Sequence, residues 1–289
     1  MTNRHIIILL AAILFVRTAV FSQEINSDSL RTDTARVVDH SFFSRWNIAR
    51  LGAATLVAGT LIYGAGVWWV HDYRPFHFWN VGWWEDDNGV DKLGHMFTSY
   101  FMYHAMYEMF LWGGHDTTAS FWWASGVAAF HGLAIEIGDG YSDYGFDYRD
   151  VTSCWTGLAY GMLQTKVPFF RNFDLKWSLY YPLEKHSFKV NDLYDYHIYW
   201  MSFRVEELLP QTWKPYWPGF FQIAFGLGTK ESTQRRTYNI ALDYNLEKLP
   251  LEGQDINLFK KIINMIHLPA PGVRLSKGHA PEWQVMLTN

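Results

Sequence analysis

Residues 136–150, EIGDGYSDYGFDYRD, separate two of the most apolar segments of the chain. Five carboxylates and one arginine fall within these fifteen residues. The segments on either side, TTASFWWASGVAAFHGLAIEI (117–137) and VTSCWTGLAYGML (151–163), have the length and composition of buried helices. We therefore expect two helices joined by an acidic connection, whose carboxylates either cap the helix ends or form a site.

Two further apolar segments precede this pair. LGAATLVAGTLIYGAGVWWV (51–70) runs for twenty residues without a charge, which is typical of a membrane-spanning or fully buried helix. LGHMFTSYFMYHAMYEMFLW (93–112) is apolar on almost all sides. In the segment 151–163, Gly157 and Gly161 are four residues apart, so the backbone of a neighbouring helix can approach closely. The sequence thus predicts a compact apolar helical bundle of about four helices over residues 45–172.

The character of the chain changes after residue 172. FFQIAFGLGTK (220–230) and RRTYNIALDYNLEKL (235–249) alternate in polarity around the polar turn ESTQ, which predicts a β-hairpin. INLFKKIINMIHL (256–268) predicts a short amphipathic helix, and EWQVML (282–287) a last strand. The expected fold class is mainly α, with a smaller mixed α+β region at 173–289. Its strands belong either to a small sheet or to an outer-membrane-like edge.

The N-terminus carries an export signal. MTNRH is a short cationic region and IIILLAAILFV an eleven-residue apolar one, so residues 1–22 are predicted to be a Sec-type signal peptide. An uncleaved anchor helix is the alternative. Residues 23–44 are polar and predict a flexible leader. Because no cysteine follows the apolar region, we expect no lipid anchor there.

The composition of the chain limits the classes of partner that it can bind. A net charge of -4 leaves no basic surplus for phosphates, which argues against nucleic acid. Fifteen tryptophans and seventeen tyrosines indicate a membrane interface. The single cysteine, Cys154, excludes an intrachain disulfide and is expected to be a packed thiol. We expect a periplasm-facing, membrane-associated envelope protein whose partners are membrane lipid or envelope proteins, with inner and outer membrane both open.

The charged residues of the apolar region form the candidate site. Asp91 and Asp150 each stand at a helix start, where a carboxylate caps exposed N–H groups. Glu136 and Asp139 stand at a helix end, where the helix dipole disfavours acids. Lys92, Arg149, a histidine or a metal ion is expected to compensate them. His95 lies in a nearly apolar helix and is either a satisfied buried residue or a functional one.

The candidates fall into three groups. The hypothetical catalytic residues are His95, Glu136 and Asp139. The polar cluster and helix caps are Asp91, Lys92, His131, Asp147, Arg149 and Asp150, and the helix-packing glycines are Gly157 and Gly161. No cofactor is expected, but a metal ion held by the His/Glu/Asp cluster is an alternative, although neither an H-E-x-x-H motif nor an EF-hand spacing is present. No G-x-S-x-G serine motif occurs.

DKLGH (91–95), the acidic stretch and the small-residue helix behind it together resemble the YfiM-like family of predicted periplasmic proteins of unknown function, in particular its Bacteroidetes-type members. They are similar, more distantly, to the VanZ-like membrane proteins. The resemblance extends from Asp91 to about Gly161. It implies recurring polar positions at Asp91, Lys92, His95, Glu136, Asp139, Gly140 and Asp150. The asparagine common in the family falls at Cys154, the lipobox of its lipoprotein members is absent, and the family implies no reaction.

Two functions fit these residues. The first is a structural or assembly factor of the envelope, in which the cluster is a buried hydrogen-bonded network that holds three helices together. The second is a membrane-embedded enzyme or binding protein that acts on a lipid-linked or cell-wall ligand, with Glu136 or His95 in acid/base work. The structural function is favoured, because each acid has a workable structural role and no nucleophile or ligand spacing is complete.

Overall fold

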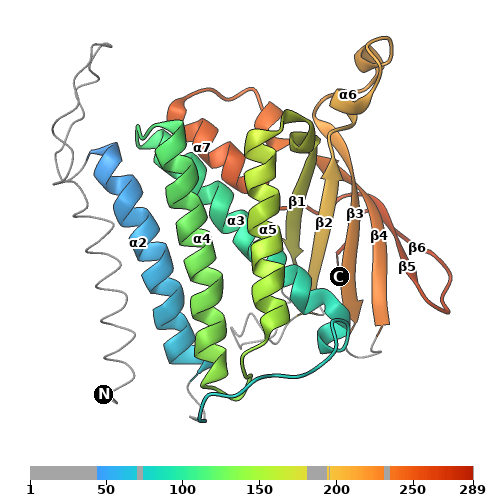
Figure 1. Cartoon of the computed structure of the whole chain (residues 1–289). Helices are drawn as coiled ribbons and strands as arrows, with labels where there is room; N and C mark the ends of the chain where they lie inside the picture. The colour runs from blue at the N-terminus through green and yellow to red at the C-terminus, as the bar shows by residue number, and fades with distance from the viewer. Residues whose placement is uncertain (1–43, 70–73, 181–193, 195, 231–234, 289) are drawn as a thin grey trace. The chain divides into compact units, whose positions relative to one another are not determined.

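The computed structural model describes residues 44–69, 74–180, 194, 196–230 and 235–288 (Figure 1). The predicted signal peptide and all but the last residue of the predicted leader lie outside the described residues. The chain forms two compact units, each built from two separate stretches. The first unit comprises Met1–Trp79 and Met102–Asp147, and the second comprises Asn80–Phe101 and Tyr148–Asn289. The predicted domain boundary after residue 172 stays a prediction.

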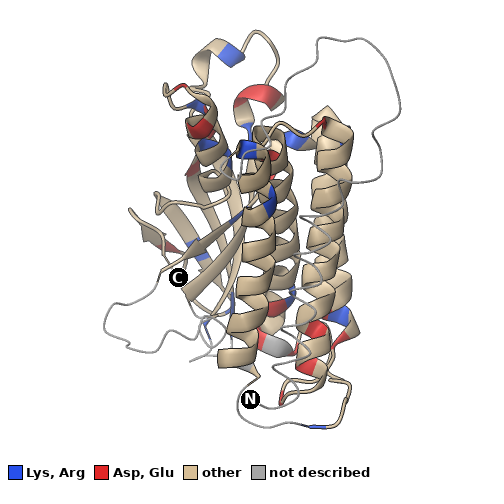
Figure 2. Cartoon of the chain, turned by 90° about the vertical axis from the view of Figure 1, so that its left-hand side faces the viewer, with Lys and Arg blue, Asp and Glu red and all other residues tan. Residues whose placement is uncertain are grey.

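The first unit is helical. It contains α2 (Arg45–Tyr63), α4 (Thr117–Gly140) and the second part of α3 (Val90–Trp112). Asp116 caps α4, because its carboxylate accepts from the backbone N–H groups of Thr118 and Ala119 at 2.9 Å each. Along α4 the only charged residues are Glu136 and Asp139 near its end, and Figure 2 shows helices that are tan over most of their length.

One side of α2 is buried and the other is exposed. Ala49, Ala53 and Val57 are almost fully buried, whereas Leu51 and Ile62 are 45% and 55% exposed. Among the described residues, one helix, Arg45–Val67, is long and apolar enough to cross a membrane by length and composition. It is not fully buried, so the membrane-spanning alternative stays a prediction.

The second unit is built around a sheet. It contains the first part of α3, α5 (Tyr148–Lys166), α6 (Val205–Leu208) and α7 (Gln254–Ile263). Its antiparallel sheet has six strands in chain order: β1 (Phe173–Leu179), β2 (His197–Phe203), β3 (Phe221–Lys230), β4 (Arg235–Tyr244), β5 (Gly272–Ser276) and β6 (Glu282–Gln284) (Figure 1).

The predicted fold class, a mainly α bundle of about four helices with a small mixed region, is therefore wrong. The hairpin of β3 and β4 is confirmed, although its turn at 231–234 lies outside the described residues. The predicted amphipathic helix is α7, and the start of the predicted last strand is β6. The error arose because β1, β2 and β5 are short and bury polar residues, where an apolar residue is the usual signal. β1 buries Asp174 and Lys176, β2 buries Ser202, and β5 buries Arg274.

The two faces of the sheet differ sharply in chemistry. One row of mutually paired residues crosses all six strands on one face and is wholly apolar: Leu175, Met201, Phe225, Ile240, Val273 and Trp283. The adjacent row, on the opposite face, is mostly polar: Lys176, Trp200, Gly226, Asn239, Arg274 and Glu282. Of these two faces, the mostly polar one is the buried one, with Lys176 at 0% and Arg274 at 3% exposure.

A charge network occupies this buried face. Lys176 Nζ lies 2.7 Å from Asp243 Oδ2, and both side chains are fully buried. The Ser202 hydroxyl donates to the same carboxylate at 2.5 Å. His267 stacks on Trp200 with ring centroids 4.0 Å apart, and burial lowers the pKa of His267 to about 4. The buried charges of Lys176 and Asp243 are thus paired with one another, as the burial of a charge requires.

Helices α3 and α5 pack closely in this unit. Phe97 and Tyr100 of α3 lie with Leu175, Trp177 and Tyr199 of the sheet in one apolar cluster. A Cβ atom built on Gly157 of α5 would lie 1.9 Å from the backbone oxygen of Met96 in α3. The absence of a side chain at Gly157 is therefore a condition for this helix crossing.

We expect Gly157→Ala to lower the thermal midpoint by several degrees, because the added methyl group forces two backbones apart and overpacking costs about 1–3 kcal/mol. Gly126→Ala in α4 is the matched control, since a Cβ there meets no atom within 4 Å. It should leave the midpoint unchanged or raise it through better helix propensity. Equal midpoints for the two variants, measured by circular dichroism, would contradict the close crossing.

Candidate functional site

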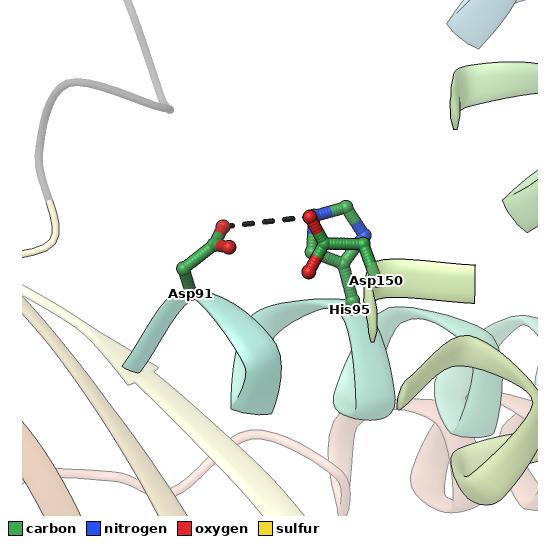
Figure 3. Close-up of side chains that lie close together, drawn as sticks. All are labelled: Asp91, His95 and Asp150. Atoms are coloured by element: carbon green, nitrogen blue, oxygen red, sulfur yellow. Dashed lines mark ion pairs between the residues drawn. The ribbon is translucent and has the colours of Figure 1, made fainter. Parts of the chain in front are cut away.

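A cluster of charged side chains lies where α3 and α5 begin. Asp91 and His95 stand one turn apart on α3, and Asp150 stands in the first turn of α5. Figure 3 shows these three side chains pointing toward one another from the two helices. Lys92, the fourth member, is 5% exposed. We call Asp91, Lys92, His95 and Asp150 the helix-start cluster.

A tight turn places the start of α3. Asp87, Asn88 and Gly89 all have positive φ, a conformation that aspartate, asparagine and glycine tolerate best. Two hydrogen bonds connect Asn88 to the sheet. Its side-chain Nδ2 donates to the Thr229 hydroxyl at 2.8 Å, and its backbone carbonyl accepts from Arg236 Nε at 2.7 Å. The start of α3 is thereby positioned by β3 and β4.

Lys92 joins the two carboxylates of the cluster. Its Nζ lies 2.9 Å from Asp91 Oδ2 and 2.7 Å from Asp150 Oδ1. One ammonium group thus bridges acids from two different helices. Both carboxylates also lie in the first turn of a helix, where the positive end of the dipole favours them.

His95 lies against the other side of both acids. Its Nε2 is 3.6 Å from Asp91 Oδ1 and 3.8 Å from Asp150 Oδ2, and its Nδ1 is 3.7 Å from the Cys154 sulfur. Tyr194 completes the contacts, because its hydroxyl donates to Asp91 Oδ1 at 2.5 Å. The His95 side chain is 21% exposed, the most accessible of the four charged residues.

The acids control the protonation of the cluster. Burial by itself would lower the pKa of His95, but the carboxylates of Asp91 and Asp150 raise it well above its ordinary value. Burial raises the pKa of Asp150 to about 6, helped by repulsion from Asp91 and opposed by the two cations. The pKa of Asp91 is lowered despite its burial, because His95 and Lys92 favour its charged form.

Two chemical capacities follow from this geometry. With His95 protonated, two cations balance two carboxylates, so the cluster can be neutral overall while buried. Asp91, His95 and Asp150 also each offer one ligand atom, and these atoms lie within 4.8 Å of one another, so the three could hold a metal ion.

The two acids near the end of α4, Glu136 and Asp139, have partners within the first unit. The indole N–H of Trp69 donates to Asp139 Oδ1 at 2.6 Å. The backbone N–H of Asp147 donates to Glu136 Oε2 at 3.3 Å, and Glu136 is 1% exposed. A Cβ on Gly138 would lie 2.2 Å from the Trp69 ring, so the glycine gives the indole its place.

The structure therefore brings Asp91, Lys92, His95 and Asp150 together in the second unit. Of the other predicted polar residues, His131, Glu136, Asp139 and Asp147 belong to the first unit, and Arg149 donates to Asn80 at 3.2 Å in the second. The grouping of His95, Glu136 and Asp139 as hypothetical catalytic residues stays a prediction. Of the packing glycines, Gly157 makes the close crossing and Gly161 is buried in α5.

Sequence reasoning missed two features of the second unit. Tyr194 is far from Asp91 in the chain, and no local pattern marks it. The pair of Lys176 and Asp243 was also missed, although Asp174 and Lys176 alternate with apolar residues along β1. This alternation predicts a strand, and it would have predicted the polar face of the sheet if the charged residues had been assumed to be the buried ones.

Comparison with known proteins gives one family. Residues 80–166 match the sequence profile of a family described as "Predicted periplasmic lipoprotein (DUF2279)". The match includes the whole helix-start cluster and supports an envelope protein of unknown function that faces the periplasm. It covers less than a third of the chain. No curated protein and no solved structure matches.

We expect the stability contributed by His95 to depend on pH. A raised pKa means that the folded state binds the proton more tightly, so this stabilisation is fully present below pH 6.5 and is lost as pH rises through the folded-state pKa. The thermal midpoint of wild type should exceed that of His95→Asn by several degrees below pH 6.5, and the difference should shrink in alkaline buffer.

The exposed His279 provides the control. His279→Asn should differ from wild type by only a small amount, because an exposed side chain contributes little to stability. A His95→Asn difference that is constant across the same pH range would show that the histidine is not protonated in the fold.

Proposed function

We propose that this protein is a membrane-associated structural or assembly factor of the cell envelope, whose helix-start cluster holds α3 and α5 together. The observation that carries this proposal is the bridge from Lys92 Nζ to Asp91 and Asp150, at 2.9 and 2.7 Å. Each charged group has an opposite charge within reach, which is how a buried ionic network serves as a structural element.

The envelope location and the membrane association have separate support. The family matched by residues 80–166 is described as periplasmic, and the predicted signal peptide agrees with export. Arg45–Val67 has the length and composition of a membrane span, with exposed Leu51 and Ile62 on its outer side. We propose that α2 makes the membrane contact of the first unit.

A buried ion network positions the helices that carry it and adds little net free energy of folding. Removing one partner leaves a buried charge uncompensated and costs about 3–5 kcal/mol, whereas replacing the whole network by neutral groups is often tolerated. The cluster is partly accessible, so the lower end of this range applies. This asymmetry separates a structural role from a catalytic one.

We expect Lys92→Met alone to lower the thermal midpoint by several degrees, since it leaves two carboxylates near each other without their shared cation. The triple variant Asp91→Asn, Lys92→Met, Asp150→Asn removes all three charges and should recover most of the loss. In cells that lack the gene, the triple variant should restore growth under detergent stress as well as wild type does.

The cellular result decides between the two functions. A triple variant that folds with a near-normal midpoint but fails to restore growth would contradict the structural role, because the fold would then be intact and the charges still required. Lys248→Met, which removes an exposed ion pair with Glu206, is the control for loss of a lysine and should be close to neutral.

The second candidate function is an enzyme or binding protein for a lipid-linked or cell-wall ligand. It is favoured by the three ligand atoms within 4.8 Å and by the partial exposure of His95. If it holds, purified protein incubated with zinc and dialysed should retain stoichiometric metal, and Asp150→Asn should lose it. Equal metal in both proteins would count against a site at this position.

A further inference from the structure

The sheet of the second unit differs from a sheet that faces water, because its exposed face is apolar. Its buried face combines charged and polar side chains with a small apolar cluster that includes Ile198, Trp200 and Ala224. An antiparallel sheet with one solvated face normally buries apolar residues and exposes polar ones. Here Lys176, Asp243 and Ser202 are fully buried, while Phe225 is 50% and Trp283 is 68% exposed. The apolar row and the mostly polar row alternate along the strands and are paired across all six of them. The difference in chemistry therefore extends across the sheet.

The exposed face is continuous and nearly free of charge. We call it the outer face, and its exposed members are Met201, Phe225, Tyr238, Ile240, Leu275 and Trp283. Its helix-covered part lies at β1 and β2, where Phe97 packs against Trp177 and Tyr199. The part with exposed side chains, centred on β3 and β4, groups Phe225, Tyr238 and Ile240, whereas a water-facing surface usually carries apolar side chains singly.

Exposed aromatic residues flank both ends of the longest strands. Trp213 and Tyr216, 63% and 83% exposed, precede the start of β3. At the opposite end, the guanidinium of Arg236 at the start of β4 lies 4.8 Å from the centre of the exposed Trp84 ring. Tryptophan and tyrosine gather where apolar and aqueous layers meet, and arginine reaches out to headgroups.

The spacing of these aromatic groups fits a bilayer. β3 and β4 have ten residues each, and a strand of that length spans about 33 Å. The hydrocarbon core of a bilayer is about 30 Å thick. Both strands have hydrogen-bonded neighbours on either side, so their backbone groups need no water, as contact with lipid requires.

We propose that the outer face at β3 and β4 contacts the acyl chains of a lipid bilayer, with the two aromatic groups near its headgroup layers. The proposal rests on the membrane association proposed above and adds a lipid-contacting surface in the second unit. Lipid is favoured over a second copy of the chain, because uncharged rows bounded by aromatic residues at both strand ends match a layered solvent.

Site-directed labelling tests this surface. Phe225→Cys on the outer face and Glu252→Cys in an exposed loop provide two labelling positions, and the native Cys154 is buried and should remain unlabelled. Each full-length variant, labelled with an environment-sensitive dye, is reconstituted into vesicles of phosphatidylethanolamine and phosphatidylglycerol. We expect bromine on the acyl chains to quench most of the emission at position 225 and little at position 252.

Other results would overturn the proposal in distinguishable ways. If the protein floats with the vesicles but position 225 is not quenched, the outer face is not the lipid contact, although the membrane association stands. If the protein does not float at all, both fail. Disulfide formation between two copies of the unlabelled Phe225→Cys variant under a mild oxidant, with no quenching of the labelled variant, would assign the face to a second copy. Unlabelled wild type carried through the same reaction gives the background, and unchanged thermal midpoints establish that both variants fold.

Discussion

The bridge from Lys92 to Asp91 and Asp150 sets how the starts of α3 and α5 meet in the second unit. It pairs acids from the first turns of α3 and α5 at 2.9 and 2.7 Å. From there α3 presents Phe97 to the sheet, and α5 presents Gly157 to the α3 backbone. Gly157 allows the two helices to approach closely but makes no directional bond. The ion pairs are directional, so they fix the orientation of the two helices.

Local patterns predicted much of the helical part. The segments expected at 93–112 and 117–137 lie within α3 and α4, and the helix expected at 151–163 lies within α5. Their ends were set too short, because polar first turns such as Tyr148–Asp150 resemble loops in sequence. The sheet was largely missed, because β1 and β5 bury charged residues and β2 buries Ser202. A method that expects apolar residues at every buried position does not detect such strands.

The residues of the candidate site could be predicted where a local pattern marks them, and not where they depend on contacts between distant segments. Asp91, Lys92, His95 and Asp150 were singled out from the sequence because acids at helix starts and a histidine in an apolar helix are locally visible. Tyr194 was not, since its contact with Asp91 depends on how distant segments meet. The neighbours of Asp139 were likewise hidden, because its bond from Trp69 joins residues 70 positions apart.

The two units are interleaved along the chain, with Asn80–Phe101 belonging to the second and Met102–Asp147 to the first. A single cut therefore releases neither unit as a continuous piece. Synthesis from the N-terminus makes Asp91, Lys92 and His95 long before the strands beside them, so this stretch must wait for Asp150 and then for the sheet. Slow, late-closing contacts of this kind give export a window in which the chain is still unfolded.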